Sequence, residues 1–238
     1  MKHLIVIGVG GFPRELYNHA KDSIGYGVDW DFKGYLDGDK KAPVDEYEKL
    51  PKPVLGDIFT YEIKKDDVFI CAVGAPHIRK RLIETVEERG GEFISVIHKT
   101  AIVHENARIG KGCILCPYTV VMSCAIIEDH VTLQVYAGVG HDSHVGKYTS
   151  IMGNVSITGN VHIGDLVYMG DSSNTLPHAR IGDGAFVGAS SLVLRRVKSG
   201  DKVFGVPALS ILPTPPQLRD CNKNSTVACL LEERRRAA

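Results

Sequence analysis

The chain of 238 residues is long enough for one large or two small domains, and its 44% apolar and 24% charged residues are ordinary for a globular protein. Its 28 basic and 28 acidic side chains balance, so the composition gives no reason to expect nucleic acid or an acidic membrane surface as a partner. The sequence has no run of 18 apolar residues that would predict a membrane span, and its opening MKHLIVIGVGG lacks the flanks of a signal peptide, so we expect a cytoplasmic protein.

The chain begins with a strand, a glycine turn and a helix. Residues 3–7 are all apolar or weakly polar, which predicts a buried parallel strand, and Gly8-Val9-Gly10-Gly11 follows. Pro13 then opens a helical segment and takes the place of the third glycine in G-x-G-x-x-G. Such an arrangement can bind a phosphate on backbone N–H groups, but a plain tight turn would use the same residues.

Further apolar runs predict the rest of a small α/β unit. Residues 32–38 predict a second strand with Asp37 at its carboxyl end, where a carboxylate can bind a ribose or a base, although Asp37-Gly38 could also be only a turn. Residues 39–50 predict a surface loop. The remaining predicted elements are strands at 54–58, 68–73 and 93–97 and a helix at 76–90 that ends at two glycines. Together they make about half of a dinucleotide-binding domain.

Residues 95–202 form an uninterrupted repeat of six residues. Every sixth position from Ile97 to Val193 carries a bulky apolar side chain, with Thr175 as the exception. This periodicity predicts a parallel β-helix in which three hexads make one triangular coil, and 18 hexads make six coils. A β-sandwich is the alternative, but it would need turn signals at longer and more varied spacing. The repeat stops near residue 208, and residues 209–238 form a polar tail with a basic end.

The cysteine and histidine side chains could either pack as part of the fold or take part in chemistry. Cys113 and Cys116 form a C-x-x-C, but no second Cys or His pair follows at zinc-finger spacing, so we expect packed thiols and no metal site. Most of the 10 histidines should be solvated side chains on the faces of the coils. His141 differs because Asp142 follows it: a carboxylate can fix the tautomer of a histidine base, provided that the pair lies at a corner or bulge.

Residues 1–210 resemble the sugar O- and N-acyltransferases of the sialic acid O-acetyltransferase type, which are PglD-like hexapeptide-repeat enzymes. This group includes bacterial enzymes that N-acetylate nucleotide-linked 4-amino-4,6-dideoxy sugars. The segments that carry the resemblance are VIGVGGFPRE, AVGAPHIRKRL, VIHKTAIVHENARIGKG, GHDSHVGKYTSIMGNVSITGNVHIGD and VFGVPA. The hexapeptide motif is shared by many acyltransferases, whereas the glycine-rich α/β domain followed by IHKTA is more specific.

The resemblance implies a homotrimer with active sites in the clefts between neighbouring β-helices and acetyl-CoA as the cosubstrate. It implies that His141 is the general base and that Asp142 supports it, at a place where the family more often has Glu. The expected acetyl-CoA contacts are Ser150, Gly159, Asp171, Gly188 and Ala189. The expected contacts of the sugar nucleotide are Gly10, Gly11, Asp37 and Gly74.

The expected fold is therefore a Rossmann-like half domain at residues 1–94, a left-handed parallel β-helix of about six coils at 95–208, and a tail at 209–238. The expected function is N-acetylation of a nucleotide-linked amino sugar. One alternative is O-acetylation of sialic acid or another sugar without a nucleotide. A second alternative is a non-enzymatic or metal-binding trimer, for which the candidate ligands are His130, His141, His144 and His162.

Overall fold

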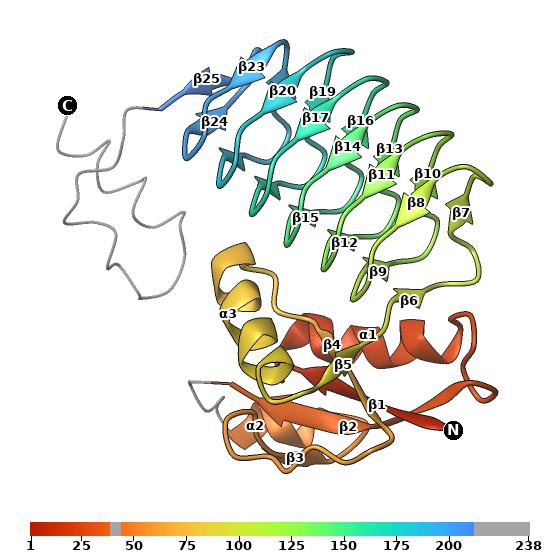
Figure 1. Ribbon diagram of the computed structural model, residues 1–238. Coiled ribbons are helices and arrows are strands. Elements are labelled where there is room, and N and C mark those ends of the chain that lie inside the picture. Colours follow the sequence, from red (N-terminus) through yellow and green to blue (C-terminus); the bar gives the residue numbers. More distant parts are fainter. Residues whose placement is uncertain (39–43, 212–238) are drawn as a thin grey trace, which may run out of the picture.

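The computed structural model describes residues 1–38 and 44–211, which form an α/β unit followed by a long β-helix (Figure 1). The rest of the predicted tail, residues 212–238, lies outside the described residues. Among the helices that are described, none is long and apolar enough to cross a membrane.

The α/β unit is a five-stranded parallel sheet with the strand order β3-β2-β1-β4-β5, which is the order of a Rossmann-type half domain. Its elements are β1 (Lys2–Ile7), α1 (Gly11–Lys21), β2 (Trp30–Asp37), α2 (Val44–Glu48), β3 (Val54–Asp57), β4 (Asp67–Cys71), α3 (Pro76–Glu87) and β5 (Glu92–Phe93). Side chains alternate along β1: Leu4 and Val6 share a core with α1, whereas Ile5 and Ile7 share a core with α3. The predicted half domain is confirmed.

Two predicted elements differ from the structure. Part of the surface loop expected at residues 39–50 is the short helix α2. The single strand expected at residues 93–97 is two strands, because β5 pairs with β4 while β6 (Val96–Ile97) pairs with β9 (Ile114–Leu115) of the β-helix. The chain thus passes from one sheet to another between Phe93 and Val96, and residue 94 remains our proposed domain boundary.

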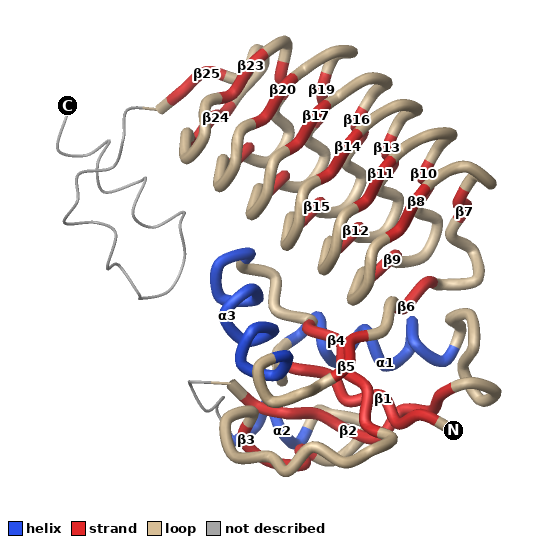
Figure 2. Tube along the Cα trace, viewed as in Figure 1, coloured by secondary structure: helices blue, strands red, loops and turns tan. Residues whose placement is uncertain are grey.

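The β-helix has three parallel sheets, which we call the β6, β7 and β8 faces after their first strands (Figure 2). The β6 face holds β6, β9, β12 (Thr132–Leu133), β15 (Ser150–Ile151), β18 (Tyr168–Met169), β21 (Phe186–Val187), β24 (Lys202–Phe204) and the antiparallel β25 (Leu209–Ser210). The β7 face holds β7 (Ile102–Val103), β10 (Val120–Val121), β13 (Gly138–Val139), β16 (Ser156–Ile157), β19 (Asn174–Thr175) and β22 (Leu192–Val193). The β8 face holds β8 (Arg108–Ile109), β11 (Ile126–Ile127), β14 (His144–Val145), β17 (His162–Ile163), β20 (Arg180–Ile181) and β23 (Arg196–Val197).

The repeat register follows the predicted hexads up to Val193 and then slips, because only two residues separate β22 from β23, so that Arg180 pairs with Arg196, 16 positions later. Val139 pairs with Val121 and with Ile157, so equivalent residues lie 18 positions apart on successive coils. The side chains at the third place of each hexad fill the interior, and together they form one continuous apolar core. Thr175, the polar exception, is also buried there. Six coils and the α/β unit therefore match the architecture predicted from the sequence.

Each coil turns three corners. The His141 corner, between the β7 and β8 faces, holds Ser123, His141, Gly159, Pro177 and Arg195. The Asp171 corner, between the β6 and β7 faces, holds Gly153, Asp171 and Ala189. The α3 corner, between the β8 and β6 faces, holds Lys111, Asp129, Lys147, Asp165 and Asp183. Each corner therefore brings together residues that are far apart in sequence.

The α3 corner packs against the α/β unit. Lys111 Nζ lies 2.6 Å from Glu87 Oε1 on α3. His130, expected to be solvated, is instead only 2% exposed, because Phe93 covers its edge and Tyr148 stacks on its ring at a centroid distance of 5.2 Å. Burial lowers the pKa of His130, and the nearby Glu87 carboxylate opposes this shift.

Candidate active site

The first candidate site is a pocket at the carboxyl ends of β1, β2 and β4, where ligands bind in sheets of this type. It has a volume of about 790 Å³. All four residues predicted to contact the sugar nucleotide line it, namely Gly10, Gly11, Asp37 and Gly74. They come from three segments that are distant in sequence, so the structure brings them together as the sequence analysis expected.

The glycine turn after β1 shapes one wall of this pocket. Gly8 has φ of +113°, a backbone conformation that side chains with a Cβ rarely adopt, and a Cβ there would also lie 3.1 Å from Pro13 Cγ. Gly10 is the N-cap residue of α1, and nothing lies within 4 Å of the Cβ position of Gly10 or Gly11. A phosphate can therefore approach the first backbone N–H groups of α1 closely.

Asp37 lies at the end of β2 and also lines this pocket. Its Oδ1 accepts a hydrogen bond from the Gly38 N–H at 2.8 Å, and its Oδ2 accepts one from the Tyr47 hydroxyl. The side chain is therefore held in one orientation. A carboxylate has about four acceptor positions, so Asp37 can accept a ribose hydroxyl as well.

Two polar residues of this pocket were missed by the sequence analysis. His77 and Arg81 lie on α3 and both line the pocket. Their spacing of four residues places them on one side of the helix, above Gly74, and this spacing was visible in the segment AVGAPHIRKRL. A guanidinium at this position can bind a phosphate through paired N–H donors.

The second candidate site is the His141–Asp142 pair. The Nδ1 atom of His141 lies 2.7 Å from Asp142 Oδ2, and both side chains are more than half exposed, at 57% and 54%. Asp142 has φ of +55°, so the chain turns a corner between the two residues and their side chains can meet. The tautomer with its proton on Nδ1 donates to Asp142 and leaves Nε2 unprotonated, as a general base requires.

Gly159 lies beside His141 on the next coil. A Cβ at Gly159 would be only 2.5 Å from His141 Nε2 and 2.6 Å from Cε1, so the imidazole occupies the space of a side chain. Within the described part of the chain, the Gly159 N–H donates no hydrogen bond. A free donor next to an unprotonated nitrogen can stabilise an oxyanion that forms at the same place.

The other predicted acetyl-CoA contacts are on a different corner. Asp171 and Ala189 are exposed neighbours on the Asp171 corner, and Asp171 Oδ1 accepts a hydrogen bond from the Gly153 N–H at 3.0 Å. Gly188 next to them is buried, and a Cβ there would lie 2.1 Å from Phe204 Cδ1. The single chain therefore does not bring these three residues together with His141.

Ser150 does not lie on an open surface, contrary to its assignment as an acetyl-CoA contact. It is fully buried under the α/β unit, where its hydroxyl donates to the Gly74 carbonyl at 2.8 Å and accepts from Arg79 Nη1 at 2.7 Å. The α/β unit covers this part of the β6 face. The structure assigns Ser150 to the junction between the two domains.

Arg79 is the largest fully buried side chain of the described residues. It donates to the carbonyls of Val73 at 3.0 Å and Tyr148 at 2.5 Å, in addition to Ser150. Burial lowers its pKa to about 10, which still leaves it charged at neutral pH. Arg79 and Ser150 together hold the Val73-Gly74 segment of the first pocket on the β-helix.

Cys113, Cys116 and the candidate metal-ligating histidines lie at separate places in the described part of one chain. Burial raises the pKa of the Cys113 and Cys116 thiols to about 12 each, so both stay neutral and pack as small apolar groups. In the described ranges, no three His, Cys, Asp or Glu side chains are grouped so that they could hold a metal ion. His144 and His162 stack on each other at a centroid distance of 4.8 Å on the β8 face.

Comparisons with known proteins found similar sequences and similar folds. Residues 3–86 match the model of the PglD N-terminal domain. The UDP-N-acetylbacillosamine N-acetyltransferase of Bacillus subtilis (strain 168) is 33% identical over 122 residues, which are 48% of this chain and 51% of the relative. The GDP-perosamine N-acetyltransferase of Escherichia coli O157:H7 is 28% identical over 82 residues, which are 34% of this chain and 37% of the relative. The chain thus spans about half, or less, of the length of these curated relatives.

A solved structure covers more of the chain. The acetyltransferase domain of PglB from Neisseria gonorrhoeae FA1090 superposes with a TM-score of 0.78 at 25% identity, over 89% of this chain and 100% of that domain. The same domain in complex with acetyl coenzyme A superposes with a TM-score of 0.76. Neighbours of this type are left-handed β-helix acetyltransferases, in agreement with the predicted hand of the coils. Residues 3–86 therefore match the PglD N-terminal domain, and the chain as a whole is similar in fold to an acetyltransferase domain of this kind.

Proposed function

We propose that this protein transfers the acetyl group of acetyl-CoA to the amine of a nucleotide-linked 4-amino-4,6-dideoxy sugar. The observation that carries the proposal is the His141–Asp142 hydrogen bond, with His141 Nε2 beside the Gly159 amide. The two curated relatives support the acceptor class, because both are named as N-acetyltransferases of sugars linked to GDP or UDP. The pocket formed by Gly10, Asp37 and Gly74 is where the nucleotide binds in this proposal.

The mechanism follows from the positions of these groups. The sugar amine attacks the thioester carbonyl and loses a proton to His141 Nε2, while Asp142 stabilises the imidazolium that forms. The Gly159 N–H donates to the oxyanion on the attacked carbon. When the carbon–sulfur bond breaks, His141 returns the proton to the departing thiolate, so the products are the N-acetyl sugar and free CoA. His141 ends each cycle in its starting protonation state.

The arrangement of the corners supports a homotrimer with its active sites between subunits. In one chain, His77 of the nucleotide pocket lies near Gly184 at the α3 corner, whereas His141 lies on another corner and Asp171 on the third. In the proposed trimer, the His141 corner of one subunit faces the Asp171 corner and the nucleotide pocket of a neighbour. Light scattering coupled to size-exclusion chromatography should give three times the chain mass of 26.0 kDa. A fully active enzyme that is monomeric in this measurement would contradict the arrangement.

The experiment that tests the activity is the release of free thiol from acetyl-CoA with a panel of acceptors. The panel holds UDP-, dTDP- and GDP-linked 4-amino-4,6-dideoxy sugars and free sialic acid. Turnover with a nucleotide-linked amino sugar is expected and would identify the nucleotide, with mass spectrometry locating the acetyl group on nitrogen. Turnover with sialic acid alone would instead favour the O-acetyltransferase, and no turnover with any acceptor would favour a non-enzymatic β-helix.

A further inference from the structure

Arg79 is a buried cation whose hydrogen-bond partners are all neutral. Its side chain is 1% exposed. Its acceptors are the carbonyls of Val73 and Tyr148 and the hydroxyl of Ser150. In the described part of the chain, no carboxylate pairs with it. A charge is costly to bury unless an opposite charge compensates it, so this arrangement is unfavourable in the protein without a ligand.

The surroundings of Arg79 do not neutralise its charge. The titratable groups that act on its pKa are the thiols of Cys71 and Cys113. Burial raises the pKa of these thiols to about 11 and about 12, so both are uncharged near pH 7. Arg79 also lies near the N-terminal end of α3, which has no acidic residue in its first turn and carries a partial positive charge. Two sources of positive potential therefore add at this end of the helix.

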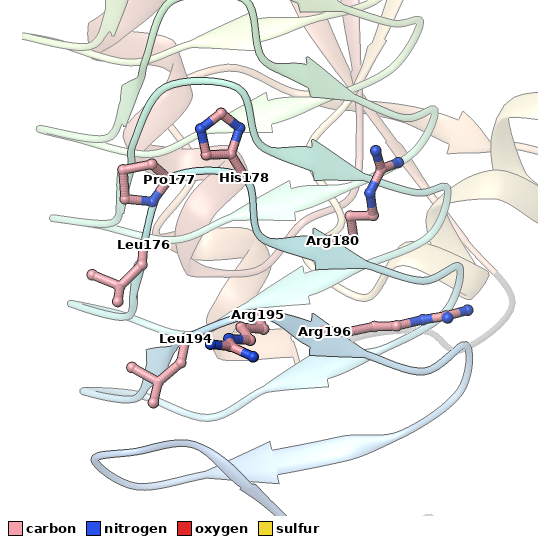
Figure 3. A pocket seen from close by; sticks show the side chains of 7 residues that line it. All are labelled: Leu176, Pro177, His178, Arg180, Leu194, Arg195 and Arg196. Carbon is pink, nitrogen blue, oxygen red and sulfur yellow. The ribbon is translucent and has the colours of Figure 1, made fainter.

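The arginines on the last coils differ from Arg79 in their exposure. Arg180, Arg195 and Arg196 line a hollow of about 490 Å³, where Figure 3 shows their side chains. All three are exposed, so water weakens the action of their charges on other groups. The interior around Arg79 has a lower effective dielectric constant. A ligand beside the buried arginine therefore interacts with its charge more strongly than a ligand beside an exposed one.

Two peptide groups connect Arg79 to the first pocket, which Val73 and Gly74 both line. The Val73 carbonyl accepts from Arg79 Nη1 at 3.0 Å, and the Gly74 carbonyl accepts from Ser150 at 2.8 Å. In a planar trans peptide the C=O and the N–H point in opposite directions, so the Gly74 N–H points away from Arg79. For the same reason the Ala75 N–H points away from Ser150. Among the described residues neither N–H has an acceptor, so both can donate to an anion on this side of the pocket.

The other groups of the pocket also suit an anion. Gly10 at the N-terminus of α1 and Arg81 on α3 both line it. Asp37 is the one carboxylate among its lining residues, and we have assigned it to the ribose. A sugar nucleotide carries its negative charge on its diphosphate, whereas its base and its ribose are neutral. The diphosphate is therefore the part of this ligand that fits the side of the pocket formed by Gly74.

We propose that Arg79 is a positioning residue for the diphosphate of the sugar nucleotide. It fixes the Gly74 N–H through the Val73 carbonyl, and Ser150 fixes the Ala75 N–H in the same way. The buried charge of Arg79 is compensated when the diphosphate binds. This inference rests on the proposed function. A residue that only joined the two domains would affect the binding of a nucleoside and of its diphosphate alike, whereas Arg79 should affect the diphosphate alone.

The test compares Arg79→Met and Arg79→Lys with Lys111→Met. The methionine removes the charge and the donors of Arg79, whereas the lysine keeps the charge. Lys111→Met is the matched control, because it also removes a cation and a contact between α3 and the coils, namely the ion pair with Glu87. The affinities for UDP, GDP and dTDP are measured by calorimetry, and those for the matching nucleosides by NMR titration at the same salt concentration.

We expect Arg79→Met to weaken the binding of the preferred diphosphate about tenfold, as for a lost hydrogen bond to a charged group. The affinity for the nucleoside should not change. Arg79→Lys should lose less, and Lys111→Met should bind both ligands as the wild type does. In turnover assays, KM for the nucleotide sugar should rise in Arg79→Met, while kcat and KM for acetyl-CoA stay constant.

Ser150→Ala keeps the test decisive if the Arg79 variants do not fold, which thermal unfolding would show. It keeps the charge of Arg79 and removes the donor to the Gly74 carbonyl, so the affinity for the diphosphate should fall about fivefold, as for a neutral hydrogen bond. Equal losses for the diphosphate and the nucleoside would overturn the inference. An equal loss in Lys111→Met would also overturn it, as would a wild-type protein that binds none of the three diphosphates.

The inference and the proposed function can fail separately. A wild-type protein that acetylates none of the acceptors, but whose affinity for a diphosphate depends on Arg79, would refute the proposed acceptors and support this inference. A wild-type protein that acetylates a nucleotide-linked amino sugar, but binds the corresponding diphosphate independently of Arg79 and Ser150, would support the proposed function and overturn this inference.

Discussion

The two parts of the molecule build their sites in different ways. The α/β unit collects Gly10, Asp37 and Gly74 from the ends of three strands, so residues distant in sequence meet around one pocket. The β-helix instead repeats one position every 18 residues, so His141 and Gly159 meet because they are equivalent residues of adjacent coils. Substitutions in the first site should weaken the binding of one ligand, whereas substitutions on the His141 corner should slow the chemical step.

The largest effect is expected for His141→Ala. Removing a general base costs about 10²–10⁴-fold, so kcat should fall at least about 100-fold while KM for both substrates changes little. The side chain is 57% exposed, and the fold should therefore keep its thermal stability. Steady-state release of thiol measures kcat, and His162→Ala on the β8 face is the control. Near-normal turnover of the His141 variant would show that His141 is not the general base.

A nearly equal effect is expected for Gly159→Ala. Its Cβ would lie 2.5 Å from His141 Nε2, so the imidazole must move, and a displacement of about 1 Å can cost about 100-fold in rate. The matched control is Gly138→Ala on β13, because nothing lies within 4 Å of the Cβ position there. Equal kcat values for the two variants would show that the close approach of Gly159 to His141 has no role in catalysis.

A smaller effect is expected for Asp142→Asn. The amide oxygen can still accept from His141 Nδ1, so the tautomer is kept while the charge that stabilises the imidazolium is lost. A hydrogen bond to a charged group contributes about 1.5–3 kcal/mol, which corresponds to a loss of about 10-fold to 100-fold in kcat. Rate measurements should place this variant between the wild type and His141→Ala, and a loss as large as that of His141→Ala would mean that Asp142 does more than support the base.

The smallest effect is expected in the pocket of the α/β unit. Asp37→Asn should raise KM for the nucleotide sugar about tenfold through a weaker hydrogen bond to the ribose, and leave KM for acetyl-CoA unchanged. Kinetics with each substrate varied in turn separate the two constants. If both KM values rose together, the two sites would not be divided between the domains in the way that the comparison assumes.

The sequence predicted those features that depend on local periodicity. The hexads gave the number of coils and their interior side chains, and the Asp142 corner was required by the chemistry of the His141 pair before φ of +55° was known. The sequence also held an unused signal: Asp171 lies 30 residues after His141, which is not a multiple of 18, so the two residues cannot share a corner.

The features that the sequence could not predict depend on how the two domains pack. Ser150 and His130 occupy hexad positions that normally face solvent, yet both are buried where α3 and β5 cover the coils. The hexad pattern is the same in covered and uncovered coils. Which coils are covered depends on how the α/β unit packs against the β-helix. Arg79 is a further case, since a charged helix residue is usually exposed unless its partners come from elsewhere in the fold.

The 18-residue period also limits how such a protein can change length during evolution. An insertion of one whole coil between Gly159 and Pro177 would move the later coils about 4.8 Å along the axis and keep every later residue on its corner. An insertion or deletion of a single hexad would instead move all later residues to the next corner. The last coil shows the other change that the fold accepts, since the turn between β22 and β23 is two residues shorter and Arg180 pairs with Arg196, 16 positions later. Tolerated length changes in this part of the chain should therefore be whole coils or short changes within one corner.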